Sequence, residues 1–277
     1  MSGARRRLVI NADDFGLTSG VNRGILEAHA AGSVSSTSAL VNMPGWGDAL
    51  EWFGKRSASL GVGLHLNLVA GAPLTEAASL TDPRTVRFHS LAALAWRALT
   101  GRVRLAEVHA ECLAQIERLQ SAGVAVTHVD SHRHAHCLPG FFGAVRAAAR
   151  SRNVGVIRVP REPMRAGAHA PIAMLKKAAL RVGIAVSGAR ATDRRAEFFG
   201  VSLQESTNFL AGVLDRLDHL PAGPSELVVH PGYNSPELEE LDPYTTVRER
   251  ELRALTSPEL RARLGKGDIE LVSFGAL

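Results

Sequence analysis

The sequence predicts an α/β fold with parallel strands, arranged as a barrel or as an open sheet. Short β-rich runs alternate with longer helical patterns along the whole chain, which is the order of repeated βα units. The 277 residues are 45% hydrophobic and have a mean hydropathy close to zero, which is enough apolar material for a sizeable core. These values exclude a disordered tail protein and a fibrous repeat.

The predicted strands are short runs of apolar and β-branched residues. They cover residues 8–11, 36–42, 61–66, 124–130, 156–159, 226–230 and 269–274. Helical patterns separate them and cover residues 20–31, 49–56, 91–99, 105–121, 141–152, 172–182, 203–217 and 247–255. The helix over 105–121 is the clearest, because its apolar residues fall on one stripe that can pack against a sheet.

We expect a single domain over residues 1–277, because we find no internal repeat, low-complexity tract or convincing linker. The best candidate boundary, near residues 166–171, is too short to divide the chain. A polar stretch with prolines over residues 71–87 interrupts the strand–helix order and looks like an excursion from the sheet.

The basic net charge of the chain suggests a nucleic-acid-binding protein, but the distribution of the arginines and the aromatic content do not support this. The 32 basic and 27 acidic residues give a net charge of +5 and a pI of 9.7. The arginines are scattered and aromatic residues make up only 5% of the chain, so stacking platforms for single strands are scarce. We therefore expect no nucleic-acid partner.

Cysteine usage and hydropathy favour a cytoplasmic protein. Cys112 and Cys137 are too few and too far apart for a disulfide framework. A basic cluster at residues 5–7 is followed by an apolar run that breaks at once, so we expect no secretory signal. We also expect no transmembrane helix, because no run of 18 uncharged apolar residues exists. A basic helix near Lys176 and Arg181 could meet a membrane surface, although a solvated face is the simpler interpretation.

Unusual polar residues stand at the carboxyl ends of the predicted strands. They are Asp13 and Asp14, His65, Asp130 and His132, Arg158, and His230. In parallel α/β folds this edge is where ligands bind and catalytic residues gather. Five strands are therefore expected to converge on one site.

Asp13 and Asp14 are adjacent carboxylates directly after an apolar strand. Taken alone, the pair is more simply a turn followed by a helix N-cap. Neighbouring carboxylates point in different directions, however, and can take different roles, one on a metal and the other on a proton.

Histidines form the densest feature of the chain. Residues 127–136 hold four of its 11 histidines immediately after a predicted strand. Imidazoles with one carboxylate suit a divalent metal and leave coordination positions open, so His132 becomes a candidate ligand. His65 alone would be a hydrogen-bonded core residue, but with these partners it is a candidate ligand as well.

His230 ends a strand and is followed by Pro231 and Gly232, which predict a sharp turn. The turn would hold the imidazole at the strand edge, where a histidine that does not bind the metal can act as a general acid.

Four ordered motifs resemble those of the YdjC-like carbohydrate deacetylases, which include chitooligosaccharide deacetylases and a relative associated with hopanoid biosynthesis. They are Asn11-Ala12-Asp13-Asp14-Phe15-Gly16, Gly63-Leu64-His65, Asp130-Ser131-His132 and His230-Pro231-Gly232-Tyr233. The resemblance covers essentially the whole chain and implies a distorted (β/α) barrel of the carbohydrate deacetylase type. It also implies that specificity is shaped by insertions near residues 71–101 and 166–199.

The resemblance assigns roles to residues of this sequence. It implies a divalent metal on Asp14, His65 and His132, with Asp13 as general base, His230 as general acid and Arg158 beside the catalytic aspartate. Four further residues are expected in a supporting shell or at the substrate: Asn11, Asp130, His134 and Tyr233. On ligand grounds zinc suits this set, and magnesium, manganese or nickel remain open.

The sequence thus predicts a metal-dependent hydrolase that removes the acetyl group from an N-acetylated amino sugar, either an oligosaccharide or a glycoconjugate such as a glycolipid. A metal-dependent phosphoesterase is the enzymatic alternative, and a carbohydrate-binding protein without turnover is the other. Glycosidase chemistry also needs two carboxylates but leaves the histidines without a role. A homodimer is a general expectation for such a protein.

Overall fold

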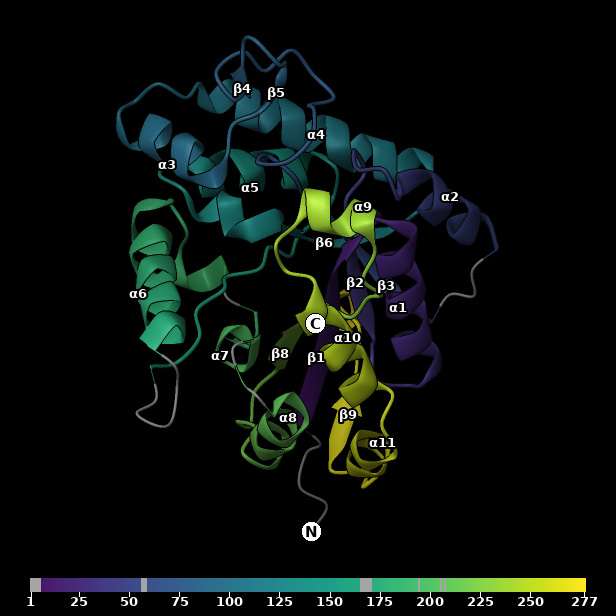
Figure 1. Ribbon diagram of the computed structural model, residues 1–277. Coiled ribbons are helices and arrows are strands. Elements are labelled where there is room, and N and C mark those ends of the chain that lie inside the picture. The colour runs from purple at the N-terminus through teal and green to yellow at the C-terminus, as the bar shows by residue number, and fades with distance from the viewer. Residues whose placement is uncertain (1–5, 56–58, 165–170, 194, 205, 207) are drawn as a thin grey trace.

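The strand β1 (Arg6–Phe15) is the centre of a parallel sheet in the computed structural model (Figure 1). The structure describes residues 6–55, 59–164, 171–193, 195–204, 206 and 208–277. Within them the strands of the main sheet follow the order β6-β3-β2-β1-β8-β7, and β9 also pairs with β1. Their bounds are β2 (Ser36–Ala39), β3 (Gly61–Leu66), β6 (Val126–Ser131), β7 (Glu197–Phe199), β8 (Ser225–Val229) and β9 (Ile269–Leu271).

All pairings in this sheet are parallel, so the carboxyl ends of its strands lie at one edge. β1 is buried from Leu8 to Phe15, as expected for a strand with neighbours on both sides. The sheet curls into a half-barrel, and among the described residues no pairing joins β6 to β7 at its two ends. The predicted α/β fold with parallel, barrel-like strands is confirmed.

Helices surround the sheet. They are α1 (Ser19–Ala30), α2 (Trp46–Lys55), α3 (Leu91–Leu99), α4 (Leu105–Ser121), α5 (Phe141–Ser151), α6 (Pro171–Val186), α7 (Val201–Gln204), α8 (Phe209–Asp218), α9 (Pro236–Leu241), α10 (Thr246–Leu255) and α11 (Pro258–Leu264). Side-chain caps fix several starts: Thr18 accepts from the Val21 amide before α1, and Ser90 accepts from the Ala93 amide before α3.

Two predicted elements are divided or reduced in the structure. The helix expected over 203–217 is divided into α7 and α8, because the Asn208 side chain accepts from the Ala211 amide and starts a new helix there. The strand expected over 156–159 is reduced to a single bridge between Ile157 and Val129. Pro160 has no amide hydrogen to extend that ladder.

Residues 71–101 form an excursion that carries a small hairpin, β4 (Thr81–Asp82) and β5 (Arg87–Phe88), before α3. In Figure 1, α3 lies above α6 at the left of the molecule, away from the sheet. Of the second predicted insertion, residues 166–170 and 194 lie outside the described residues. None of the described helices combines the length and apolar character needed to cross a bilayer.

Candidate active site

An extra residue in β1 brings two consecutive carboxylates to the rim. Between Ala12 and Phe15, β1 advances by one residue more than β2, and Asp14 adopts a left-handed φ of 74°. Gly16 follows with a φ of 96°, where a Cβ would lie 2.4 Å from the Leu40 carbonyl oxygen. Neighbouring residues of a regular strand point to opposite faces, so this bulge allows Asp13 and Asp14 to reach one site.

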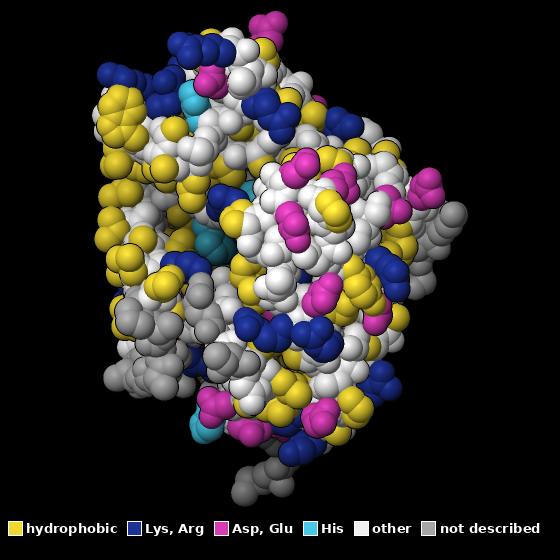
Figure 2. Space-filling view, viewed as in Figure 1, with side chains coloured by type: hydrophobic (Ala, Val, Ile, Leu, Met, Phe, Trp, Pro, Cys, Tyr) yellow, Lys and Arg dark blue, Asp and Glu magenta, His cyan; other side chains and the backbone are white. Residues whose placement is uncertain are grey.

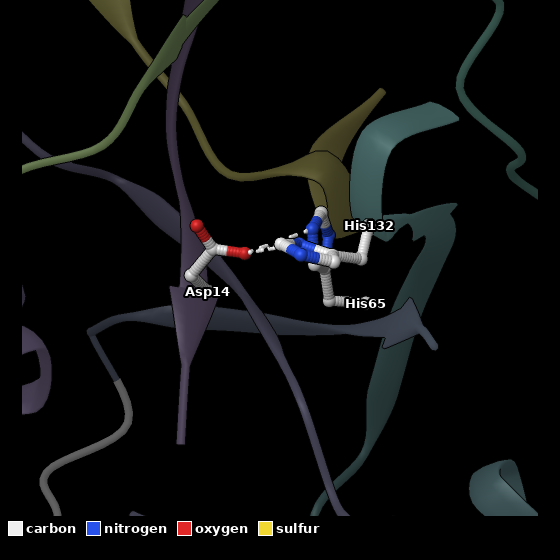
Figure 3. A group of neighbouring side chains, drawn as sticks. All are labelled: Asp14, His65 and His132. Atoms are coloured by element: carbon white, nitrogen blue, oxygen red, sulfur yellow. Dashed lines mark hydrogen bonds and ion pairs between the residues drawn. The ribbon is translucent and has the colours of Figure 1, made fainter. Parts of the chain in front are cut away.

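Asp14, His65 and His132 converge at the carboxyl edge of the sheet (Figure 3). Asp14 Oδ1 lies 3.2 Å from His65 Nε2 and 2.9 Å from His132 Nδ1. All three side chains are buried, and their candidate ligand atoms lie within 4.8 Å of one another. Two imidazole nitrogens and a carboxylate oxygen form a donor set that suits a divalent metal, so these residues fit such an ion.

Two neighbours orient this cluster. His65 Nδ1 lies 2.6 Å from Asp130 Oδ1, which directs Nε2 toward Asp14. Arg248 Nη2 donates to Asp14 Oδ2 at 2.7 Å and leaves Oδ1 to face the two imidazoles. Burial raises the pKa of Asp14, but the Arg248 guanidinium and the His132 and His65 imidazoles together outweigh burial and hold this pKa well below its usual value.

The environment of His65 favours positive charge. Burial lowers the pKa of this imidazole, but the Asp130 and Asp13 carboxylates outweigh burial and raise it to about 10. The same carboxylates would stabilise a metal cation in this position.

Asp13 forms a bidentate ion pair with Arg158. The two guanidinium nitrogens Nη1 and Nη2 donate to its carboxylate oxygens at 2.6 and 2.8 Å, and Asn11 Nδ2 donates to Oδ1 at 2.7 Å. Burial and the neighbouring Asp130 raise the pKa of Asp13, but Arg158 and His65 together more than offset them and keep the pKa below its usual value. Asp13 is therefore ionised at neutral pH, as a general base must be.

Arg158 also contacts Asp130, at 2.7 Å, and Glu226, at 2.6 Å. Asp13, His65 and Asp130 form a second cluster with metal-like spacing. Because Arg158 already places a positive charge between the two carboxylates of that second cluster, the set of Asp14, His65 and His132 is the better metal candidate.

His230 follows β8 and lies beside Asp13, with its Nε2 4.0 Å from Asp13 Oδ2. The backbone amide of His230 donates to Glu251 Oε2 at 2.6 Å, and the ring packs edge-on against Tyr244 at 5.2 Å. The imidazole is thereby placed near the metal candidate without belonging to it.

These groups form the base of a cavity of about 600 Å³. Asp13, Asp14, His65, His132 and His230 all line it, and Figure 2 shows a histidine at the bottom of the hollow. Much of the remaining wall comes from apolar residues of α3 and α6. The floor of the cavity is therefore lined by ionisable side chains, and its entrance is apolar.

The other predicted site residues divide between the cavity and the surface. His134 lines the cavity, and burial lowers the pKa of its ring to about 3, so it is neutral. The Tyr233 hydroxyl instead donates to Glu27 Oε2 at 2.5 Å, and Arg23 stacks over the Tyr233 ring. The structure thus places Tyr233 against α1 rather than at the cavity.

A family model described as YdjC-like protein matches residues 7–266. The chain belongs to the YdjC-like protein family. The resemblance noted in the sequence is thereby confirmed over nearly the whole chain.

Two relatives named as deacetylases are similar to this chain over nearly their whole length. A carbohydrate deacetylase from Vibrio cholerae is 32% identical over 279 residues, which covers 98% of this chain and 96% of the relative. A chitooligosaccharide deacetylase from Yersinia pestis is 34% identical over 270 residues, with 96% and 97% covered. A crystal structure of a putative cellobiose-phosphate cleavage protein from Enterococcus faecalis matches with a TM-score of 0.74, at 26% identity and 99% coverage of both chains.

The YdjC-like site contains two buried residues that sequence reasoning did not single out, Arg248 and Glu226. Arg248 lies within a charged helix, Val-Arg-Glu-Arg-Glu, which has the pattern of a solvated face. Glu226 stands at the start of a predicted strand. A signal existed for Glu226, because a carboxylate inside an otherwise apolar parallel strand needs a partner.

Proposed function

We propose that this chain is a metal-dependent hydrolase that removes the acetyl group from an N-acetylated amino sugar, giving the free amine and acetate. The supporting observation is the cluster of Asp14, His65 and His132 at the base of the cavity, with Asp13 and His230 beside it. The deacetylase activities of the Vibrio and Yersinia relatives point to the same chemistry. The substrate is a small carbohydrate or a glycoconjugate such as a glycolipid.

Amide hydrolysis needs an activated water, stabilisation of charge on the carbonyl oxygen and a protonated leaving group. A divalent ion bound by Asp14, His65 and His132 would act as a Lewis acid toward the acetyl carbonyl and activate water for attack. Arg248 holds Asp14 and Asp130 holds His65, so the three donors keep their orientation.

Asp13 would take the proton of the attacking water. Arg158 and Asn11 bind its oxygens, which keeps the carboxylate ionised and fixed. His230 would donate a proton to the amine nitrogen as the C–N bond breaks. The net result is that the hydroxyl of the water enters acetate and one proton enters the amine. Asp13 Oδ2 and His230 Nε2, the two proton-carrying atoms, lie 4.0 Å apart.

The test compares Asp13→Asn, His65→Ala and His132→Ala with the unchanged enzyme. We expect Asp13→Asn to keep its metal and lose about 10²- to 10⁴-fold in turnover, because it removes the base and not a ligand. His65→Ala and His132→Ala should lose both the bound metal and turnover, because each removes a ligand. Metal content is measured by mass spectrometry of the purified protein, and activity as loss of one acetyl group across a panel of acetylated amino sugars.

Asp215→Asn is the matched control, because Asp215 is an exposed carboxylate on α8. Normal turnover by Asp13→Asn would refute the base assignment. Sugar binding by the metal-loaded protein without acetate release would instead identify a carbohydrate-binding protein, and release of phosphate from simple esters would favour the phosphoesterase alternative. Reconstitution with zinc, magnesium, manganese or nickel in turn identifies the metal that supports activity.

We also propose a cytoplasmic enzyme, on the basis of two buried cysteines that form no disulfide.

A further inference from the structure

The helix α6 exposes an apolar face. Its exposed side chains, among those described, are Ile172, Leu175, Lys176, Ala178, Ala179, Val182, Ala185 and Val186. Lys177 is buried and its Nζ lies 3.2 Å from Glu162, and Arg181 turns toward the Glu162 carbonyl. The solvated basic face expected from the sequence is therefore an apolar face that retains a single exposed lysine.

A second apolar surface lies on α3. Trp96 and Leu99 are exposed, Leu99 by 72%, and the Arg102 guanidinium stacks over the Trp96 ring at 4.4 Å. Tryptophan is enriched where a protein meets the boundary between water and lipid, and arginine can lie there with its apolar stem buried and its charge in water.

Both helices border the candidate active site. Leu91 and Ala95 of α3 and Ala179 and Leu180 of α6 line the cavity. Figure 2 shows hydrophobic side chains running down the left side of the molecule beside the hollow, where Figure 1 places α3 and α6. The exposed apolar surface is thus continuous with the cavity entrance, and we call it the α3/α6 face.

The charges on this face favour an anionic occupant. Neither α3 nor α6 contains an aspartate or glutamate, whereas both contain basic residues. Anionic lipid headgroups would complement the exposed Lys176 and Arg102, while the lipid chains would accept the apolar residues.

We propose that the α3/α6 face docks on an anionic lipid surface, so that the cavity opens toward the lipid. Leu175 and Val182, which are 72% and 65% exposed, would insert at the headgroup boundary. Membrane docking can be tested independently of the proposed chemistry, because vesicle binding can be measured without acetyl hydrolysis.

The test is sedimentation of the full chain with vesicles of equal parts phosphatidylglycerol and phosphatidylcholine, and with vesicles of phosphatidylcholine alone. We expect the unchanged protein to bind the anionic vesicles, and binding to weaken as salt is added. The double variant Leu175→Glu/Val182→Glu should lose about tenfold or more in the partition coefficient, because it places charge on the inserted face. Neither residue lines the cavity, so hydrolysis of a water-soluble acetylated sugar should be unchanged.

Leu50→Glu is the matched control, because Leu50 is an exposed leucine on α2, and its partition coefficient should equal that of the unchanged protein. If the double variant fails to fold, Trp96→Glu/Leu99→Glu tests the same face. Failure of the unchanged protein to bind anionic vesicles, or equal binding by all variants, would overturn the proposal. So would a dimer in solution that the double variant converts to monomer without any vesicle binding. Vesicle binding by a protein inactive on every sugar would refute only the proposed function.

Discussion

Glu226 is a buried carboxylic acid whose cationic partner is shared. Arg158 Nε lies 2.6 Å from Glu226, while the same guanidinium serves Asp13 and Asp130. Burial raises the pKa of Glu226 to about 7, because one arginine cannot compensate three buried carboxylates fully. Near neutral pH this group is divided between its protonated and ionised forms.

This pKa predicts how stability depends on pH. A carboxyl whose folded pKa lies above its unfolded value of 4.5 stabilises the fold at low pH, and that contribution is lost as pH rises toward about 7. Glu226→Gln cannot titrate. Its free energy of unfolding relative to the unchanged protein should therefore rise by up to about 3 kcal/mol over this range.

Urea denaturation at several pH values gives the free energy of unfolding of both proteins. In the difference between the two free energies, the opposite pH dependence contributed by Asp13 and Asp130 cancels. A difference that stays constant with pH would contradict the shifted pKa of Glu226.

Single residues show how far the sequence could predict the site. A polar side chain at the end of an apolar strand is a local signal, and this signal placed Asp14, His65 and His132 close together at one edge. The burial of Arg248 depends on how α10 packs against the rest of the molecule, and nothing within the sequence of that helix specifies it. Tyr233 follows His230 by three residues, but the turn between them carries its side chain toward Glu27.

At the level of elements, β3 depends on a glycine that makes room for a neighbour. A Cβ on Gly63 would lie 2.3 Å from the His128 ring, and that ring is stacked on Phe274 with centroids 3.9 Å apart. Both rings are buried, so neither can move aside without disturbing the core.

Gly63→Ala should therefore lower the free energy of unfolding by about 2 to 3 kcal/mol through overpacking. Gly143→Ala is the matched control, because Gly143 lies on the exposed side of α5 and a Cβ there meets no atom within 4 Å. That substitution should be neutral or stabilise by about 0.5 to 1 kcal/mol, since alanine favours a helix. Thermal denaturation of the two variants in parallel would contradict the packing argument if both lost equal stability.

Elements with a clear period were predicted well, and elements set by a local cap were not. Both ends of the predicted strand 61–66 and helix 105–121 agree with β3 and α4. The short helices α9 and α11 went unpredicted, although each begins with a serine cap followed by proline. A helix of six or seven residues is too short to show a periodic apolar stripe.

For the whole molecule, the candidate metal site joins distant parts of the chain. Asp14 belongs to β1, His65 to β3, and His132 to the 3₁₀ turn that follows β6. An ion that binds these three residues only when they are assembled stabilises the folded state by linkage.

Chelation should therefore lower the thermal midpoint of the unchanged protein. Restoring metal at about 100 times its Kd should return about 2.7 kcal/mol of stability, which corresponds to a midpoint shift of roughly 5 to 10 °C. The His65→Ala variant serves as the control and should respond little to either treatment. The midpoint is measured by calorimetry. If the midpoint of the unchanged protein is the same with and without metal, the result argues against the assigned ligands.

The parallel sheet was predictable because repeated strand–helix order leaves few other topologies. The extent of curling was not, since it depends on strand pairings between segments far apart in the sequence. β1 pairs with β8 over Leu8–Ala12 and with β9 over Arg6–Leu8, and both partners come from residues beyond 224.

These pairings set the order in which the protein can assemble. Translation supplies the two aspartates and their neighbour β2 early, but β8, which pairs with the other edge of β1, and β9 leave the ribosome more than 200 residues later. Until then the edge of β1 that pairs with β8 is exposed to other chains, and its pairing is a slow, long-range step. The strand that carries Asp13 and Asp14 is thus also a part of the nascent chain that needs protection from other chains until β8 is made.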